Sequence, residues 1–151
     1  MKTLTLGPAI ASLMLLALLP ASAQEHKRVS PHETVSATID GAQVKIVYGR
    51  PYTKNPKSEE MRKIWGGLVP LGQVWRMGAA EATLLTTDEK LEIGGSKIPA
   101  GTYSLYLQPE ENGPAKLIVN KQTGHWGTKH EERQDFATIH LAKSQLSAAV
   151  T

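Results

Sequence analysis

Alternation of apolar and polar residues along the chain predicts a series of short β-strands. Residues 34–39 alternate in this way, and residues 42–48 repeat the pattern. Between the two segments stands Asp40-Gly41, a two-residue sequence that favours a tight hairpin turn. The pattern therefore predicts that a β-hairpin forms the beginning of the folded domain.

Further strands are expected after a polar segment that covers residues 49–63. In that segment Ser58 precedes two glutamates, and this order predicts one or two helical turns that end near Lys63. Gly94-Gly95 marks a second tight hairpin. The remaining expected strands cover residues 73–77, 82–87, 90–93, 96–98, 102–108, 115–120 and 136–142.

Short strands at this spacing predict an all-β fold, an antiparallel β-sandwich of the jelly-roll or immunoglobulin-like kind. A parallel α/β fold would need helical crossovers, for which the sequence has no pattern. Residues 143–151 contain no turn or cap signal, and a strand that began near Ala148 would be cut off. We therefore expect C-terminal strands to be missing and an edge prone to association to be left unpaired.

The first 23 residues have the pattern of a secretory signal peptide. Lys2 precedes an apolar segment, residues 4–19, and the small residues Ala21-Ser22-Ala23 come directly before polar sequence. Cleavage is expected between Ala23 and Gln24, because signal peptidase requires small residues at such positions. An uncleaved anchor is the less favoured alternative, since the apolar segment is short for a membrane span.

The expected product is a periplasmic or secreted protein with a single domain over residues 24–151. No later segment is long and apolar enough to span a membrane. The sequence has no cysteine, so an exported form depends on packing and not on disulfides. The net charge is +3, with lysines and arginines scattered along the chain, and we therefore expect no binding to nucleic acid.

Metal binding and catalysis have little support in the sequence. His125, His130 and the nearby acids Glu131, Glu132 and Asp135 match no standard zinc spacing, so we expect no metal and no cofactor. No Gly-x-Ser-x-Gly motif occurs, and no base, nucleophile and oxyanion hole can be assembled from the motifs. The sequence therefore gives no catalytic residue.

Residues 63–83, KIWGGLVPLGQVWRMGAAEAT, are the best candidate for a functional site. The segment contains two of the three tryptophans. An indole beside a glycine-rich turn can stack against a flat ligand, and an arginine can hold a carboxylate in a bidentate manner. The expected ligand-binding residues are Trp65, Trp75, Arg76 and Glu81, with Arg50, Tyr48 and Trp126 as further candidates.

The same residues also have a structural interpretation. The chain has one phenylalanine, so the tryptophans are candidates for core packing. Arg76 and Glu81 are candidates for an internal ion pair that joins one strand to the next.

Four sequence blocks resemble a known family. They are SPHETVSATIDGAQVKIVYGRP, RKIWGGLVPLGQVWRMGAAEAT, LEIGGSKIPAGTYSLYLQP and LIVNKQTGHWG, in this order. Together they resemble an exported bacterial family known as domain of unknown function family 2911, over about residues 30–142. The resemblance implies export and a β-rich domain, and it brings no established activity.

This chain departs from the family pattern in two places. Similar sequences usually have an asparagine in the segment Gly78–Glu81, and Ala80 stands where that amide would be. If the amide binds a ligand in relatives, this protein is expected to bind more weakly or differently. Relatives also usually continue beyond this C-terminus with further strand-like sequence.

We interpret the sequence as that of a non-catalytic module that binds a small ligand, a glycan or another envelope component. One alternative is a hydrolase acting on envelope polymers through carboxylates that form no linear motif. Another is a purely structural domain whose exposed faces pack against a partner protein.

Overall fold

The computed structural model describes residues 29–145 and 147, so the expected signal peptide and the expected strand near Ala148 lie outside the described residues. All regular structure in the described part is β, apart from a single 3-10 turn, η1. The elements are β1 (His32–Ile39), β2 (Ala42–Gly49), β3 (Trp75–Arg76), β4 (Thr83–Thr87), β5 (Leu91–Ile93), β6 (Ser96–Ile98), β7 (Gly101–Gln108), β8 (Ala115–Asn120), η1 (Glu132–Gln134) and β9 (Asp135–Leu141).

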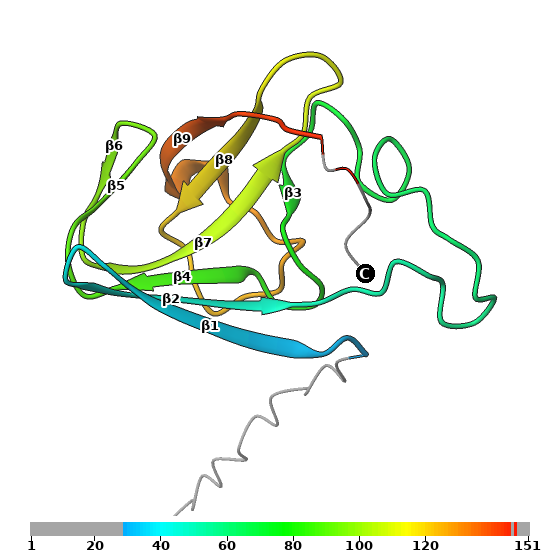
Figure 1. Ribbon diagram of the computed structural model, residues 1–151, viewed down its shortest axis with the longest axis horizontal. Helices are drawn as coiled ribbons and strands as arrows, with labels where there is room; N and C mark the ends of the chain where they lie inside the picture. The colour runs from blue at the N-terminus through cyan, green and yellow to red at the C-terminus, as the bar shows by residue number, and fades with distance from the viewer. Residues whose placement is uncertain (1–28, 146, 148–151) are drawn as a thin grey trace, which may run out of the picture.

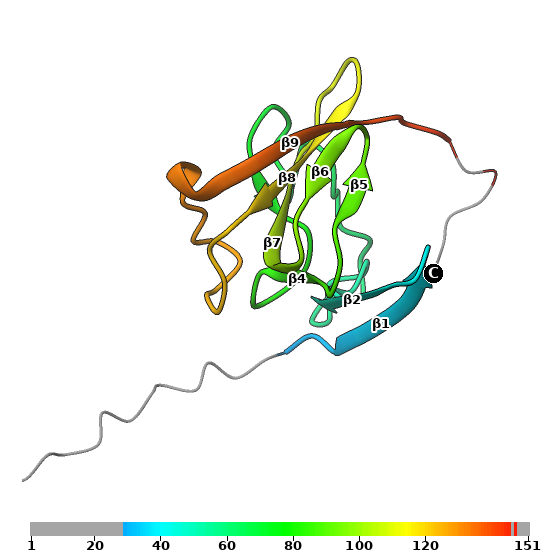
Figure 2. The ribbon, with the colours of Figure 1, turned by 90° about the vertical axis from the view of Figure 1, so that its left-hand side faces the viewer.

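The strands form a large antiparallel sheet and a small one (Figure 1). The large sheet has the order β1-β2-β4-β7-β8-β9, and β3 pairs with β7 beyond the end of β4. β5 and β6 form a separate hairpin, and the large sheet curls so that this hairpin lies between β9 and the β1–β2 edge (Figure 2). The expectation of an all-β, antiparallel sandwich is confirmed, and the strand order is mainly that of a meander.

The first hairpin has the turn that its sequence predicts. Ile39 pairs with Ala42, so Asp40 and Gly41 form a two-residue turn. Both turn residues have positive φ, +48° for Asp40 and +92° for Gly41, as a type I′ turn requires. This turn matches the right-handed twist of the strands and fixes the register of β1 and β2.

The core lies on both faces of β7. Tyr103 and Leu105 face a large apolar cluster that the β5–β6 hairpin and β9 help to cover. Tyr106, whose side chain points to the opposite face, packs with Ala82 and Ile118 in a smaller cluster. Because β7 is buried on both faces, the three strands that pair with it, β3, β4 and β8, are anchored in the core.

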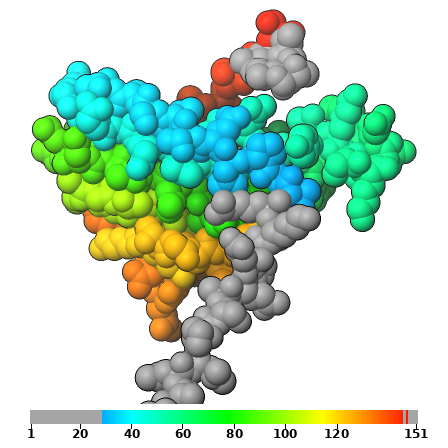
Figure 3. Space-filling model, turned by 90° about the horizontal axis from the view of Figure 1, so that it is seen from below, coloured from blue at the N-terminus to red at the C-terminus, as the bar shows by residue number. Residues whose placement is uncertain are grey.

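β1 is one of the two edge strands of the large sheet and is far less buried than β2. Val35 and Ile39 lie opposite Ile46 and Ala42 on the core side of the sheet, yet they are 48% and 50% exposed. Figure 3 shows β1 and β2, in blue and cyan, along one surface of the molecule. The apolar face of β1 therefore extends the core surface into solvent.

The prediction of helical turns after Ser58 is wrong, because the structure has no helix there. Residues 51–74 cross the end of the sheet as turns, and Lys54 forms an isolated bridge with Met61. Glu59 has φ +58°, in the left-handed region, so a right-handed helix cannot continue through it. The local sequence favours a helix here, but the segment instead folds back on itself and forms the bridge between Lys54 and Met61.

Candidate functional site

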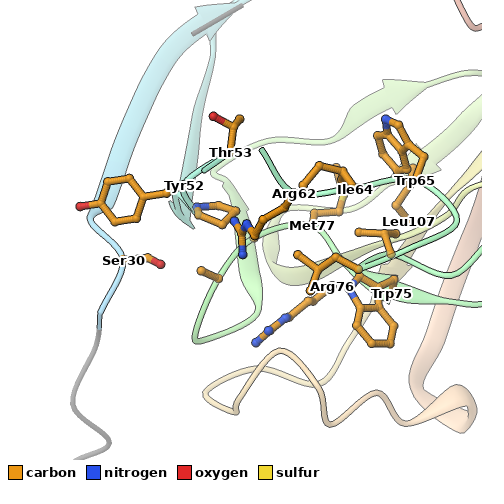
Figure 4. A pocket seen from close by; sticks show the side chains of 15 residues that line it. Ser30, Tyr52, Thr53, Arg62, Ile64, Trp65, Trp75, Arg76, Met77 and Leu107 are labelled. Carbon is orange, nitrogen blue, oxygen red and sulfur yellow. The ribbon is translucent and has the colours of Figure 1, made fainter. Parts of the chain in front are cut away.

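A pocket of about 540 Å³ lies between the segment that follows β2 and strand β3 (Figure 4). We call it the β3 pocket. One wall comes from residues 51–69, and the other comes from residues 75–79 together with Leu107 of β7. The pocket is therefore built where the long segment after β2 crosses the end of the sheet.

The floor of the β3 pocket is fixed by the sheet. Trp75 of β3 lies opposite Leu107 of β7 in an antiparallel pair, and both side chains line the pocket. Met77 also lines the pocket, as expected from its place two residues after Trp75. Val74 packs against the smaller core cluster and does not line the pocket.

The opposite wall is a tight loop that carries Trp65. The amide of Gly66 donates a hydrogen bond to the carbonyl of Val69 at 2.9 Å, and Val69 N donates to Ile64 O at 2.8 Å. A Cβ atom on Gly67 would lie 2.4 Å from the carbonyl oxygen of Lys63, so only glycine fits there. Trp65 is 57% exposed at the rim and is not a core anchor.

Two arginines supply the charge of the β3 pocket. Arg62 enters from the long segment and Arg76 from β3, and in Figure 4 their guanidinium groups extend to the same side of the pocket, away from Trp65 and Leu107. Among the described residues no aspartate or glutamate lines the pocket, and none forms an ion pair with either arginine. An apolar pocket with cationic groups and no acidic lining favours a ligand with an anionic group.

The side chain of Arg76 is positioned by the loop that follows β8. A Cβ atom on Gly127 would lie 3.1 Å from both Cβ and Cδ of Arg76. The glycine therefore allows the arginine stem to lie against the loop. Arg62 is held through its backbone, whose N–H donates to Thr53 O at 3.0 Å, and its buried Nε has no hydrogen-bond partner. An unpaired buried donor costs about 1–3 kcal/mol, so Arg62 sits in a site that its own protein does not fully satisfy.

Glu81 and Trp126 lie together, away from the described lining of the β3 pocket. Their backbones form an isolated antiparallel bridge. The carboxylate of Glu81 pairs with His32, with 2.9 Å between Nε2 and Oε2. The expected internal ion pair between Arg76 and Glu81 is therefore replaced by a pair with a histidine at the start of β1.

Tyr48 and Arg50 form a polar cluster with Glu33 at the end of the first hairpin. The Tyr48 hydroxyl donates to Glu33 Oε2 at 2.9 Å, and Arg50 donates to Glu33 Oε1. The hydrogen bond from Arg50, and then the one from Tyr48, lower the pKa of Glu33. The same contact with Glu33 raises the pKa of Tyr48. Arg50 is thus paired with a carboxylate of its own chain, unlike Arg62 and Arg76.

The two histidines of the loop after β8 each contact a side chain of a neighbouring strand. The Tyr106 hydroxyl lies 2.6 Å from His125 Nε2, and His130 Nε2 lies 2.8 Å from Asp135 Oδ1. Burial, and to a smaller extent the charge of Asp135, raises the pKa of Tyr106 to about 12. Asn120 donates to Asp135 Oδ1 at 2.7 Å and completes the network. These contacts give the loop residues a structural role.

The β3 pocket contains three of the seven residues that the sequence suggested: Trp65, Trp75 and Arg76. Sequence reasoning missed Arg62 and Leu107. Arg62 was recognisable in principle, since it is the first residue of the specific family block RKIWGGLVPLGQVWRMGAAEAT. Leu107 had no signal beyond its place in an alternating strand, because only the pairing of β3 with β7 brings it to the pocket.

A comparison with protein families matches residues 30–151 to the family described as "Protein of unknown function (DUF2911)". Neither the curated proteins nor the solved structures gave a match to this chain. In the described residues, no helix is long and apolar enough to cross a membrane.

Proposed function

We propose that this chain, which belongs to the DUF2911 family, is an exported, non-catalytic module that binds a small ligand with a flat apolar body and an anionic group. The site is the β3 pocket. A single observation carries the proposal: the β3 pocket is lined by two tryptophans and two arginines, and its described lining contains no acidic residue. These residues are Trp65, Trp75, Arg62 and Arg76.

The apolar body of the ligand lies against Trp75 and Leu107. Both are supplied by paired strands, so this surface is preformed and loses little conformational entropy on binding. Trp65, on the rim, offers an indole face that closes over a flat ligand. Pockets of this kind, mostly apolar with a few convergent polar groups, are typical of small-molecule sites.

The anionic group of the ligand lies between the guanidinium groups of Arg62 and Arg76. A charge-assisted hydrogen bond of this kind contributes about 1.5–3 kcal/mol, so the arginines supply selectivity as well as affinity. Glu81 is not part of this site, because its carboxylate pairs with His32.

Export remains part of the proposal. It rests on the first 23 residues, which have the charged, apolar and small-residue regions of a signal peptide. A ligand available in the periplasm or outside the cell therefore fits the proposal best.

The alternatives have less support. A hydrolase of envelope polymers would need two carboxylates facing each other across a cleft, and no carboxylate lines the β3 pocket in the described chain. A purely structural role would be favoured by fully buried tryptophans, whereas Trp65 is mostly exposed and Trp75 is half-buried.

A pair of fluorescent probes tests the proposal. Anilinonaphthalene sulfonate has an aromatic body with an anionic group, and N-phenylnaphthylamine has a similar aromatic body without charge. Each is titrated into residues 24–151 while tryptophan quenching is followed. The proposal predicts saturable binding of both probes, about tenfold tighter for the anionic one, which corresponds to one charge-assisted hydrogen bond.

Two further titrations identify the site. Trp75→Leu is expected to weaken the binding of both probes, because it removes the indole surface that both aromatic bodies contact. Arg133→Gln, in the exposed turn η1, removes a positive charge outside the pocket and is expected to change neither affinity. Equal affinity for the two probes, or loss of binding in Arg133→Gln, would contradict the proposed site.

A further inference from the structure

In the part of the chain that the structure describes, no strand pairs with the outer edge of β1, so backbone groups at alternate residues have no strand partner there. Arg50 N donates to Pro31 O at 2.8 Å, so the odd-numbered residues of β1 exchange hydrogen bonds with β2. The N–H and C=O groups of the even-numbered residues Thr34, Ser36 and Thr38 therefore point away from the sheet. They form a regular row of donors and acceptors along an eight-residue strand.

Apart from the charged side chain of Glu33, β1 lacks the features that usually protect such an edge. Edge strands are commonly short, bulged, or interrupted by proline or lysine. β1 contains no lysine or proline, and its pairing with β2 runs from His32 to Ile39 without a shift. The opposite edge differs, because the pairing of β9 with β8 has an irregularity at Val119 and Asn120.

The sequence of β1 is complementary to itself in an antiparallel arrangement. A two-fold axis through Ser36 brings Val35 opposite Ala37 of the second copy, and Thr34 opposite Thr38. The even-numbered residues then meet as hydrogen-bonded pairs, which is the pattern that their free N–H and C=O groups require. The apolar side chains of Val35 and Ala37 thus meet, and hydroxyls meet hydroxyls, while Glu33 lies opposite Ile39 at the ends of the paired segment.

Association in this register also covers apolar surface of β1. Val35, half-exposed on the core side of the sheet, gains apolar neighbours from the second copy. Isologous two-fold contacts of this kind are the commonest route to homodimers.

We propose that two copies of this chain associate through their β1 strands and form one continuous antiparallel sheet with Ser36 on the two-fold axis. This inference does not depend on the β3 pocket, because β1 lines no part of it.

The variant Ser36→Glu separates dimer formation from folding. Within one chain, residue 36 lies opposite Lys45, so the new carboxylate gains an opposite charge and the fold is not weakened. Across the axis, however, two glutamates lie directly opposite each other. Thr102→Glu adds the same charge at an exposed position of the interior strand β7 and serves as the control.

Sedimentation of residues 24–151 over a wide concentration range measures the association. We expect a dimer for the wild type and for Thr102→Glu, and a dissociation constant raised about fivefold or more for Ser36→Glu. Its melting temperature, measured where the protein is monomeric, is expected to be at least that of the wild type. A wild type that stays monomeric throughout would overturn the proposal.

Hydrogen exchange locates the interface. The amides of Thr34, Ser36 and Thr38 are expected to exchange slowly in the dimer and faster as the protein is diluted. A dimer in which these three amides exchange as fast as those of a free edge would place the contact elsewhere and refute the β1 interface.

Discussion

The carbonyl oxygen of Ala80 accepts a hydrogen bond from the amide of Gly127 at 2.9 Å, while Ala80 itself has φ +64°. The bond joins the motif Gly78–Glu81 to the loop that supports Arg76. Ala80 is 7% exposed and does not line the β3 pocket. Asparagine tolerates the left-handed region better than other non-glycine residues, so backbone conformation alone would account for the asparagine that the family resemblance implies at this position.

Ala80→Gly is expected to stabilise the protein by about 0.5–1 kcal/mol. The substitution removes a left-handed strain of about 1–2 kcal/mol for a residue with a Cβ and adds a smaller entropic cost in the unfolded chain. Urea unfolding measures the change. Ala82→Gly, at a buried neighbouring position with ordinary φ, is the control and is expected to be destabilising. A less stable Ala80→Gly variant would mean that packing of the Ala80 methyl group outweighs the strain.

Glu33→Gln is expected to make the stability of the protein less dependent on pH in the acidic range. The pKa of Glu33 is lowered in the folded protein by Arg50 and then by Tyr48. Its stabilising contribution is therefore fully present above the pKa of an ordinary glutamate, about 4.3, and is lost as pH falls through the lower folded value. Melting temperatures should differ between wild type and variant at neutral pH and converge in acid. A constant difference across this range would exclude the charged contact as its source.

Tyr106→Phe is expected to destabilise the protein by about 1–2 kcal/mol, because it leaves the Nε2 atom of partly buried His125 without its hydroxyl partner. The effect should be concentrated in the loop after β8, where faster amide exchange of residues 124–131 would report it. Tyr103→Phe removes a hydroxyl that donates to Pro99 O and should leave exchange in that loop unchanged. In the wild type, Tyr106 should ionise well above an ordinary tyrosine, near pH 12.

The fold was largely predictable because most of its elements are hairpins set by local sequence. Asp40-Gly41 and Gly94-Gly95 mark the two tight turns, and the strands around them begin and end within two residues of the expected positions. β3 is shorter than predicted. It covers only Trp75–Arg76, since β7 has only its last residues free beyond β4.

The candidate site was only partly predictable because its residues meet through long-range pairing. Trp75 and Arg76 stand out in the sequence, but Leu107 joins them through strand register alone. Arg62 lies in a segment whose helix signals are overridden by a turn at Glu59. Glu81 was assigned to the site from its neighbours, yet its partner is His32, which lies far away in the sequence.

The double variant Arg62→Gln and Arg76→Gln tests the central claim most directly. It keeps the size and polarity of both side chains and removes their charges. The account predicts that the affinity for anilinonaphthalene sulfonate falls by about tenfold or more, whereas the affinity for uncharged N-phenylnaphthylamine changes by less than about twofold. Loss of both affinities to the same extent, or of neither, in a variant that still melts cooperatively would contradict recognition of an anionic ligand in the β3 pocket.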